Sequence, residues 1–420
     1  MNTANLRSID ELDLNNKRVL IRVDYNCPFD NEGTITDYFR IEESLKTINY
    51  CIAQNAKSVI IMSHRGRPGG KVVEMLSMEK VAKVLGKFLQ KDVTFLPDPV
   101  PSPTTIEYCQ NPPQGSIIVL ENLRFDLGEQ GTGKDVLGNP TAATPEHIRH
   151  FRESLAKLGD VYVNDAFGTI HRAHSSMLGE GFDVRAAGFL MKSELTHLSA
   201  VLNDSQNSRP LVCILGGNKC NEKIPLMNHM CEVADEILIA GGQAYNFLKL
   251  VYGVPVGDTP IRPELEETVK AIVEKAQKNN VKLVIPEDFY ITDFFVNGQI
   301  KLADIESGIE PGWIAGDIGP KTIETFKKSI AKAKVILWNG PVGTVKFPQF
   351  NDGTKVILDE IIKATKNGCI TVAGGGRTGS VLTKWNAEGK LSHVSTGGGA
   401  FLKILEGHTF PAIDALLIKD

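Results

Sequence analysis

The chain has 420 residues, a length that favours two domains over a single core. Its composition is 42% hydrophobic and 23% charged, typical of a globular protein, and its net charge of -4 argues against a general binder of nucleic acid or of membrane surfaces. No apolar run is long enough to cross a bilayer, no secretory pattern opens the chain, and the seven cysteines form no CxxC pair, so we expect a cytoplasmic protein with free thiols and neither a nucleic-acid nor a membrane partner.

Short apolar runs in the first half of the chain predict strands that are buried on both faces of a parallel sheet. These runs are rich in β-branched residues and continuous, not alternating. An amphipathic segment at residues 37–55 places Ile41, Leu45 and Ile48 on one side at helical spacing. Residues 129–145 are interpreted as a long surface loop. The predicted strands are residues 19–23, 58–64, 92–97, 116–125 and 160–168.

The second half repeats the pattern of strand followed by helix. Residues 263–279 have Pro and Glu in their first turn and Lys toward the end, which predicts a helix. Repeated strand–helix units predict an α/β fold with two parallel sheets, and the helical segment 191–203 is the expected break between them. The predicted strands are residues 210–217, 236–242, 281–288, 334–343, 369–376 and 392–399.

Basic side chains follow several predicted strands of the first half. Ligands of open α/β sheets bind beyond the carboxyl ends of the strands, and guanidinium groups bind phosphate and carboxylate, so this edge suits a small polyanion. A single arginine there would be read as a solvated surface residue, and a single histidine as a structural one. The polar residues at these strand ends are Arg22, Asp24, Asn26, Arg40, His64, Arg65, Arg67, Arg124, His171, Arg172 and His174.

Glycines end most of the predicted strands of the second half, as at 216–217, 241–242, 340, 374–376 and 397–399. Glycine lets backbone N–H groups approach a phosphate. Lys219 and Lys223 follow the first pair at helical spacing and are suited to a transferring phosphoryl group, although solvated lysines are the alternative.

The segment from Gly374 to Gly379 matches the dinucleotide fingerprint, yet no acidic residue follows about twenty positions on, which disfavours a dehydrogenase. The chain contains no Walker motif. An anion-binding edge in one half and a nucleotide-type edge in the other suggest phosphoryl transfer across a cleft.

At these residues the chain resembles phosphoglycerate kinase along nearly its whole length. The matching motifs are RVDYNCP (22–28), MSHRGRP (62–68), LENLRF (120–125), GDVYVNDAFGTIHRAHSSM (159–177), WNGPVG (338–343) and HVSTGGGA (393–400). The resemblance implies two Rossmann-like parallel-sheet domains that face a cleft and are joined by a hinge helix. It implies residues 1–190 with a returning tail at 405–420 for the phosphoglycerate domain, and residues 191–404 for the hinge and nucleotide domain.

The resemblance also implies a reaction. A monomer would transfer a phosphoryl group reversibly between 1,3-bisphosphoglycerate and ADP in glycolysis, with Mg²⁺ as the cofactor of the nucleotide. The implied phosphoglycerate site is Asp24, Asn26, Arg40, His64, Arg67, Arg124 and Arg172. The implied catalytic groups are Arg40, Lys219, Gly376 and Gly399. The expected nucleotide site is Gly217, Lys219, Lys223, Gly242, Asn339, Gly340, Pro341, Gly343 and Thr378.

The nucleotide half departs from the family pattern. Asn218 stands where the family has an adenine-facing alanine, Glu222 replaces an aspartate, and Gly316 replaces an apolar adenine contact. Lys346 replaces a glutamate that accepts ribose hydroxyl bonds, a loss worth about 1.5–3 kcal/mol. Arg377 replaces the aspartate that holds Mg²⁺, and a guanidinium cannot ligate a hard cation, so no metal ligand is assigned. In the substrate motifs the one departure is Arg65, where leucine is usual.

Three hypotheses follow from these departures. The first is a phosphoglycerate kinase-like phosphotransferase with impaired or altered use of its nucleotide. The alternative is a non-catalytic protein that binds 3-phosphoglycerate or serves as an interaction surface. The third is that the added cations Lys346 and Arg377 accept another phosphate donor.

Overall fold

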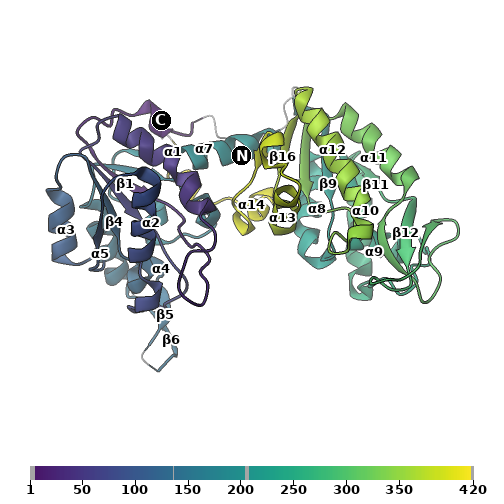
Figure 1. Cartoon of the computed structure of the whole chain (residues 1–420), viewed down its shortest axis with the longest axis horizontal. Helices are drawn as coiled ribbons and strands as arrows, with labels where there is room; N and C mark the ends of the chain where they lie inside the picture. The colour runs from purple at the N-terminus through teal and green to yellow at the C-terminus, as the bar shows by residue number, and fades with distance from the viewer. Residues whose placement is uncertain (1–4, 136, 204–207, 418–420) are drawn as a thin grey trace. The chain divides into compact units, whose positions relative to one another are not determined.

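The computed structural model describes residues 5–135, 137–203 and 208–417, which divide into two compact units (Figure 1). The first unit runs to Leu195 and resumes at Thr409, and the second is Thr196–His408. Each unit is built on a six-stranded sheet whose neighbouring strands are parallel. The α/β fold with two parallel sheets is therefore confirmed.

The sheet of the first unit has the strand order β3-β4-β2-β1-β7-β8. Neighbouring side chains of β1 are buried on opposite faces, because helices cover both faces: Val19 packs in the cluster that contains residues of α1 and α2, and Leu20 lies near Leu155 of α5 (Figure 1). The strands are β1 (Arg18–Arg22), β2 (Ser58–Met62), β3 (Val93–Leu96), β4 (Ser116–Leu120), β7 (Val161–Asn164) and β8 (Arg185–Ala187). The main helices are α1 (Phe39–Ala53), α2 (Glu79–Leu89), α3 (Pro103–Gln110), α5 (Pro145–Ala156) and α6 (Ser175–Leu178).

The prediction of a long loop at residues 129–145 is wrong. The segment holds the end of α4 (Leu127–Gln130) and an antiparallel pair of strands, β5 (Thr132–Lys134) and β6 (Pro140–Ala142). The helix α4 is capped by Asp126, whose side chain accepts from the N–H of Gly128 at 2.7 Å. Capping by a single aspartate starts a short helix without any apolar periodicity, so the pattern at this point gave no helical signal.

The sheet of the second unit has the order β11-β10-β9-β15-β16-β17. Its two faces are covered by different helices: α11 and α12 pack in the cluster around Trp338, while Met230 of α8 contacts Cys213 on the opposite face. The strands are β9 (Leu211–Leu215), β10 (Glu236–Ile239), β11 (Lys282–Val284), β15 (Val335–Asn339), β16 (Ile370–Ala373) and β17 (His393–Val394). The helices are α8 (Cys220–Val233), α9 (Gly242–Leu250), α10 (Glu266–Lys278), α11 (Pro320–Lys332), α12 (Asp352–Lys366), α13 (Gly376–Lys384) and α14 (Gly399–Leu405).

A second, antiparallel sheet in this unit was not predicted. It consists of β13 (Ile300–Asp304), β12 (Asp288–Thr292) and β14 (Ile314–Ile318). The predicted strand 281–288 ends at Val284 instead, and Asp288 opens β12. The apolar residues of this sheet form a small core of their own with Tyr245 and Val256, so their pairing depends on contacts that are distant along the chain.

The helix α7 (Phe189–Leu202) covers the segment that was expected to join the domains, and the boundary between the two units falls inside it. At the end of the chain, α15 (Pro411–Asp414) belongs to the first unit, where Leu417 forms an antiparallel bridge with Leu6. Within the described residues, no helix combines the length and the hydropathy needed to cross a membrane.

Candidate functional site

The first unit gathers its predicted anion-binding residues around the end of β1. Asp24 follows β1 and forms an ion pair with Arg40 of α1, whose Nη1 donates to Asp24 Oδ2. The backbone N–H of Asn26 donates to Asp24 Oδ1 at 3.2 Å, and Asn26 Oδ1 accepts from the N–H of Gly66 at 2.9 Å. These bonds join the segments after β1 and β2, so the side chains are positioned before any ligand arrives.

Buried polar and charged side chains form a network at this edge of the sheet. Arg22, the last residue of β1, is fully buried, and its Nη2 lies 3.2 Å from His64 Nδ1 and 3.8 Å from Glu129 Oε1. Glu129 also accepts from the N–H and Oγ of Ser176 at 2.9 and 2.6 Å. Glu129 was interpreted as part of a surface loop, but it is 1% exposed. No local signal in the sequence distinguishes it, because its burial depends on α6.

Positive charge dominates the same cluster. Burial and the nearby Arg22 and Arg172 lower the pKa of Arg124 to about 10. Burial and Arg124 lower the pKa of His174 to about 3, and burial and Arg22 hold the pKa of His64 well below its usual value. Both histidines are therefore neutral at pH 7, and the arginines carry the charge. A bound anion would relieve this mutual repulsion.

Arg124 has a buried N–H group that is suited to binding an anionic ligand. It is 4% exposed, its Nη1 donates to the carbonyl of Gly66 at 2.7 Å, and its buried Nε finds no hydrogen-bond partner among the described residues. A buried N–H group without a partner is costly, and an anion at this point would satisfy it. Of the other arginines that were expected in the site, Arg172 is half-buried and Arg67 is exposed.

Arg65, the one departure in these motifs, does not belong to the anion site. Its guanidinium lies 3.3 Å from the centroid of the Phe29 ring, and its Nη1 donates to the carbonyl of Ser77 at 3.1 Å. The side chain covers the apolar surface that a leucine would cover.

In the second unit the loops that follow β9, β15 and β16 are bonded to one another. The N–H of Gly217 donates to the carbonyl of Pro341 at 2.9 Å, and the N–H of Gly340 donates to Thr378 Oγ1 at 2.8 Å. A Cβ atom at Gly216 would lie 2.1 Å from the carbonyl oxygen of Pro341, so only glycine permits this approach. Asn339, buried beneath, donates to the carbonyl of Gly374 at 2.6 Å. These hydrogen bonds join the loops that hold five of the expected nucleotide-site residues: Gly217, Asn339, Gly340, Pro341 and Thr378.

The glycines expected to face phosphate are open to solvent. Apart from the chain neighbours and the backbone of the same helix, no atom of the described residues lies within 4 Å of the place where a Cβ would stand on Gly376, the first residue of α13, or on Gly399, the first residue of α14. The N–H of Gly242, at the start of α9, reaches Asn218 Oδ1 at 3.4 Å. Backbone N–H groups at these positions are accessible to an anion.

The two lysines of this half differ in their surroundings. Lys219 Nζ lies 2.6 Å from Glu222 Oε1, and both side chains are mostly exposed. Lys223, one turn further along α8, is half-buried, and burial lowers its pKa to about 8. Neither lysine lines the pocket described next.

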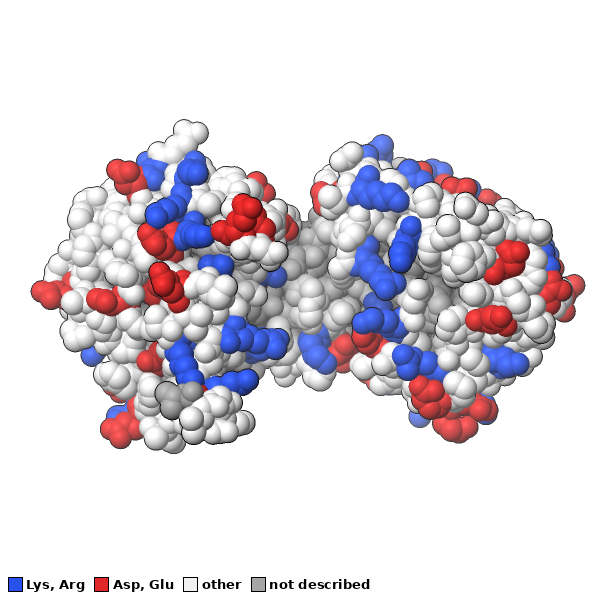
Figure 2. Space-filling view, turned by 60° about the horizontal axis from the view of Figure 1, so that its bottom comes forward, with Lys and Arg blue, Asp and Glu red and all other residues white. Residues whose placement is uncertain are grey.

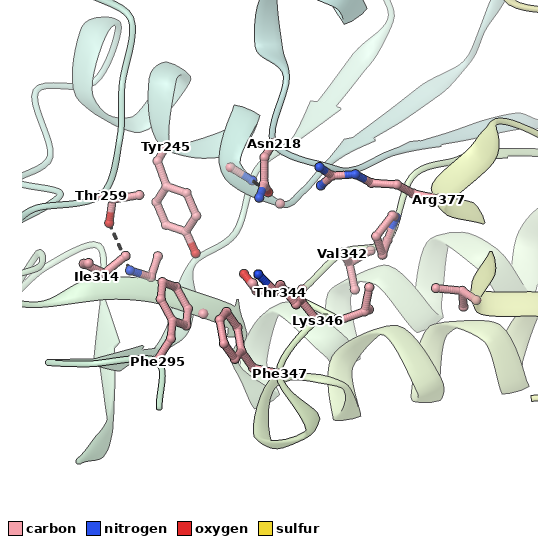
Figure 3. Close-up of a pocket in the computed structure, with 18 of the residues that line it drawn as sticks. Asn218, Tyr245, Thr259, Phe295, Ile314, Val342, Thr344, Lys346, Phe347 and Arg377 are labelled. Atoms are coloured by element: carbon pink, nitrogen blue, oxygen red, sulfur yellow. Dashed lines mark hydrogen bonds between the residues drawn. The ribbon is translucent and has the colours of Figure 1, made fainter. Parts of the chain in front are cut away.

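A pocket of about 610 Å³ opens beside these loops (Figure 3). One part is apolar, with the rings of Tyr245, Phe295 and Phe347, and the other carries the Arg377 guanidinium, which extends toward Asn218 in Figure 3. A cavity with an apolar end and a cationic end fits a base joined to phosphates. Of the expected nucleotide residues, Gly242, Pro341 and Gly343 line it directly.

The structure gives a physical reason for Gly316. This residue lies in β14 and lines the pocket, and a Cβ placed on it would lie 2.4 Å from the ring of Phe350. The ring of Phe350, which is fully buried, therefore occupies the space of the side chain that the family pattern has here. Phe350 is not among the described residues that line the pocket, whose aromatic rings are those of Tyr245, Phe295 and Phe347.

Mg²⁺ does not fit the residues that are present. This ion takes oxygen ligands, usually one or two carboxylates together with phosphates. The described residues that line the pocket include no Asp or Glu, and Arg377 occupies the expected ligand position. No cluster of three or more His, Cys, Asp or Glu in the part of the chain described here is placed to hold a metal ion.

Two α/β units, one with a candidate anion site at its strand ends and one with a pocket suited to a nucleotide, fit an enzyme that transfers phosphoryl groups between small molecules. The family model described as phosphoglycerate kinase matches residues 9–408. Similar proteins include phosphoglycerate kinase 2 of Sus scrofa and phosphoglycerate kinase 1 of Homo sapiens, each 46% identical over 418 residues and 99% of both chains. Phosphoglycerate kinase of Schistosoma mansoni is 47% identical over 410 residues, 97% of this chain and 98% of the relative. The chain belongs to the phosphoglycerate kinase family.

The solved structures agree with this assignment. Phosphoglycerate kinase from Coxiella burnetii has a TM-score of 0.85 at 34% identity, and covers 98% of each chain. The kinase from Pyrococcus horikoshii has a TM-score of 0.72 at 27% identity, again over 98% of each chain. The family and the fold that the motifs predicted are confirmed.

Proposed function

We propose that this protein transfers a phosphoryl group reversibly between 1,3-bisphosphoglycerate and an adenine nucleotide, through a nucleotide site of altered chemistry. The observation that carries the proposal is the anion-binding cluster of the first unit. Asp24, Arg40, His64 and Arg124 lie together at the strand ends, and the orphan Nε of Arg124 is suited to an anionic ligand. Such a cluster fits a small molecule that carries a phosphate and a carboxylate.

This phosphoryl transfer needs no general acid or general base. In one direction the bond between phosphorus and the acyl oxygen of 1,3-bisphosphoglycerate breaks, and a bond from phosphorus to the terminal oxygen of the nucleoside diphosphate forms. The attacking oxygen is already anionic and the acyl oxygen leaves as the carboxylate of 3-phosphoglycerate, so no proton has to move. Positioning and charge neutralisation remain, and we assign these roles to Arg40, Lys219 and the N–H groups of Gly376 and Gly399.

We place this reaction in glycolysis, in a cytoplasmic monomer. All seven cysteines are buried and free, which suits a reducing compartment.

A second candidate is a protein that binds 3-phosphoglycerate without catalysis. It is favoured by one observation: the pocket wall holds Arg377 and Lys346 where the family pattern has acids. Such a protein would keep the first site and lose turnover.

A coupled assay of 3-phosphoglycerate-dependent ATP turnover in Mg²⁺ tests the proposal. The wild type is compared with the Arg377→Asp/Lys346→Glu variant and with Lys328→Asp, a control on an exposed face of α11 away from the pocket. Turnover in the wild type and in the control is expected. A silent wild type beside an active double variant would reject the proposal in favour of the second candidate. If all three are silent, the proposal fails, and calorimetric binding of 3-phosphoglycerate decides whether the second candidate stands.

A further inference from the structure

We infer that the pocket of the second unit binds the phosphate chain of its nucleotide without a divalent metal ion, and that fixed side-chain cations take over the neutralising role. The inference rests on the proposed function only for the identity of the occupant. It concerns how the charge of the ligand is balanced, and a binding experiment can test it apart from turnover.

The charge of the pocket wall is the first argument. Three cationic side chains line the pocket, Lys346, Arg377 and Lys384, and the described lining residues contain no acid to balance them. Arg377 lies in the first turn of α13 and Lys384 is its last residue, so one short helix carries two of the three. On the face shown in Figure 2, Lys and Arg side chains gather along one part of the second unit.

These three cations are not neutralised by the protein itself. Among the described residues, no carboxylate forms an ion pair with Arg377, Lys346 or Lys384, whereas nearby Lys355 pairs with Asp359 at 2.5 Å. Like charges that line one cavity repel one another, and a polyanion would remove that cost. The lining therefore favours a ligand with more negative charge than a metal-complexed nucleotide carries.

The shape of the pocket indicates how such a ligand would lie. Tyr245, Phe295 and Phe347 bound the apolar part, where a base would be covered, and Arg377 lies on the other side with Asn218 (Figure 3). A guanidinium fork donates two parallel N–H bonds to phosphate oxygens. Mg²⁺ in the same place would meet a fixed positive charge and would compete with the side chains for the same oxygens.

Calorimetric titration of the full-length protein with ADP, once in EDTA and once in excess Mg²⁺, tests the inference. The wild type is expected to bind ADP at least as tightly in EDTA as in Mg²⁺. Arg377→Asp is expected to bind about tenfold more weakly than the wild type in EDTA, and to regain affinity when Mg²⁺ is added. The matched control Lys328→Asp introduces the same charge change on an exposed face outside the pocket and is expected to follow the wild type.

The inference is overturned if wild-type affinity falls about tenfold on removal of Mg²⁺, if Arg377→Asp binds ADP in EDTA as the wild type does, or if the wild type binds ADP under neither condition. Circular dichroism of each variant excludes unfolding as the cause of a loss. Tight metal-free binding together with absent turnover would leave this inference standing and reject the proposed kinase activity, so the two failures are distinguishable.

Discussion

The two candidate anion sites of this protein differ in how their cationic side chains are held. In the first unit Arg22 lies with Glu129 and Arg40 with Asp24, although Arg124 keeps a buried N–H group without a partner among the described residues. In the second unit Lys346 and Arg377 are exposed to the pocket, and no described carboxylate pairs with them. Both sites carry positive charge that an anionic ligand would neutralise, but carboxylates hold part of the first site in place, whereas no described carboxylate holds the cations of the second.

The comparison shows that the chemistry of a site can change while its scaffold stays. The glycine loops of the second unit are joined by hydrogen bonds, as between Gly340 and Thr378, although the charges around them differ from the family pattern. Side chains at the rim of a rigid scaffold are replaced at little cost to folding, whereas buried charges such as Arg22 depend on several partners.

The largest expected effect is at Arg124. Arg124→Met removes a buried guanidinium and is expected to weaken calorimetric binding of 3-phosphoglycerate about 100-fold, while ADP binding stays unchanged. Arg149→Gln, an exposed arginine of the same unit, is the control and should bind as the wild type does. Equal losses for both ligands in Arg124→Met would contradict the independence of the two regions.

The next effect concerns the wall of the pocket. Gly316→Leu forces a side chain into the ring of Phe350 and is expected to lower the free energy of unfolding by about 1–3 kcal/mol in urea titrations. In combination with Phe350→Ala, the loss should be smaller than the sum of the two single losses, because the clash is gone. Strict additivity would mean that the ring does not take the space of the missing side chain.

The effect that is smallest at neutral pH, and that grows only in acid, tests how tightly the first region is packed. Because the pKa of His174 is lowered to about 3, the folded state resists a proton that the unfolded state accepts near its ordinary pKa of about 6.5. Stability is therefore lost as pH falls from about 6.5 toward 3, by at most about 1.4 kcal/mol per pH unit for this group. His174→Gln should flatten that slope in urea titrations across this range. An unchanged slope would show that His174 protonates freely in the folded protein.

Much of the fold was predictable because it depends on residues that are close together in the sequence. Continuous apolar runs predicted the buried parallel strands, and the polar residues that follow them led to Asp24, His64 and Arg124, with Arg40 in the helix after β1. The antiparallel sheet was not predictable, since β12 pairs with β14 across a long insertion and its apolar residues pack against Tyr245.

By itself, then, the sequence determined the α/β class, the family and the positions where the nucleotide half departs from it, because these depend on residue identity and short spacing. Only the tertiary structure showed which charged side chains lie beside a side chain of opposite charge. Glu129 is buried under Arg22 because α4 and α6 meet there, and Phe350 fills the space above Gly316. It also showed that Lys346, Arg377 and Lys384 line one pocket without an acid among its described residues. Electrostatic and packing energies depend on distance in space, so residues far apart along the chain set them together.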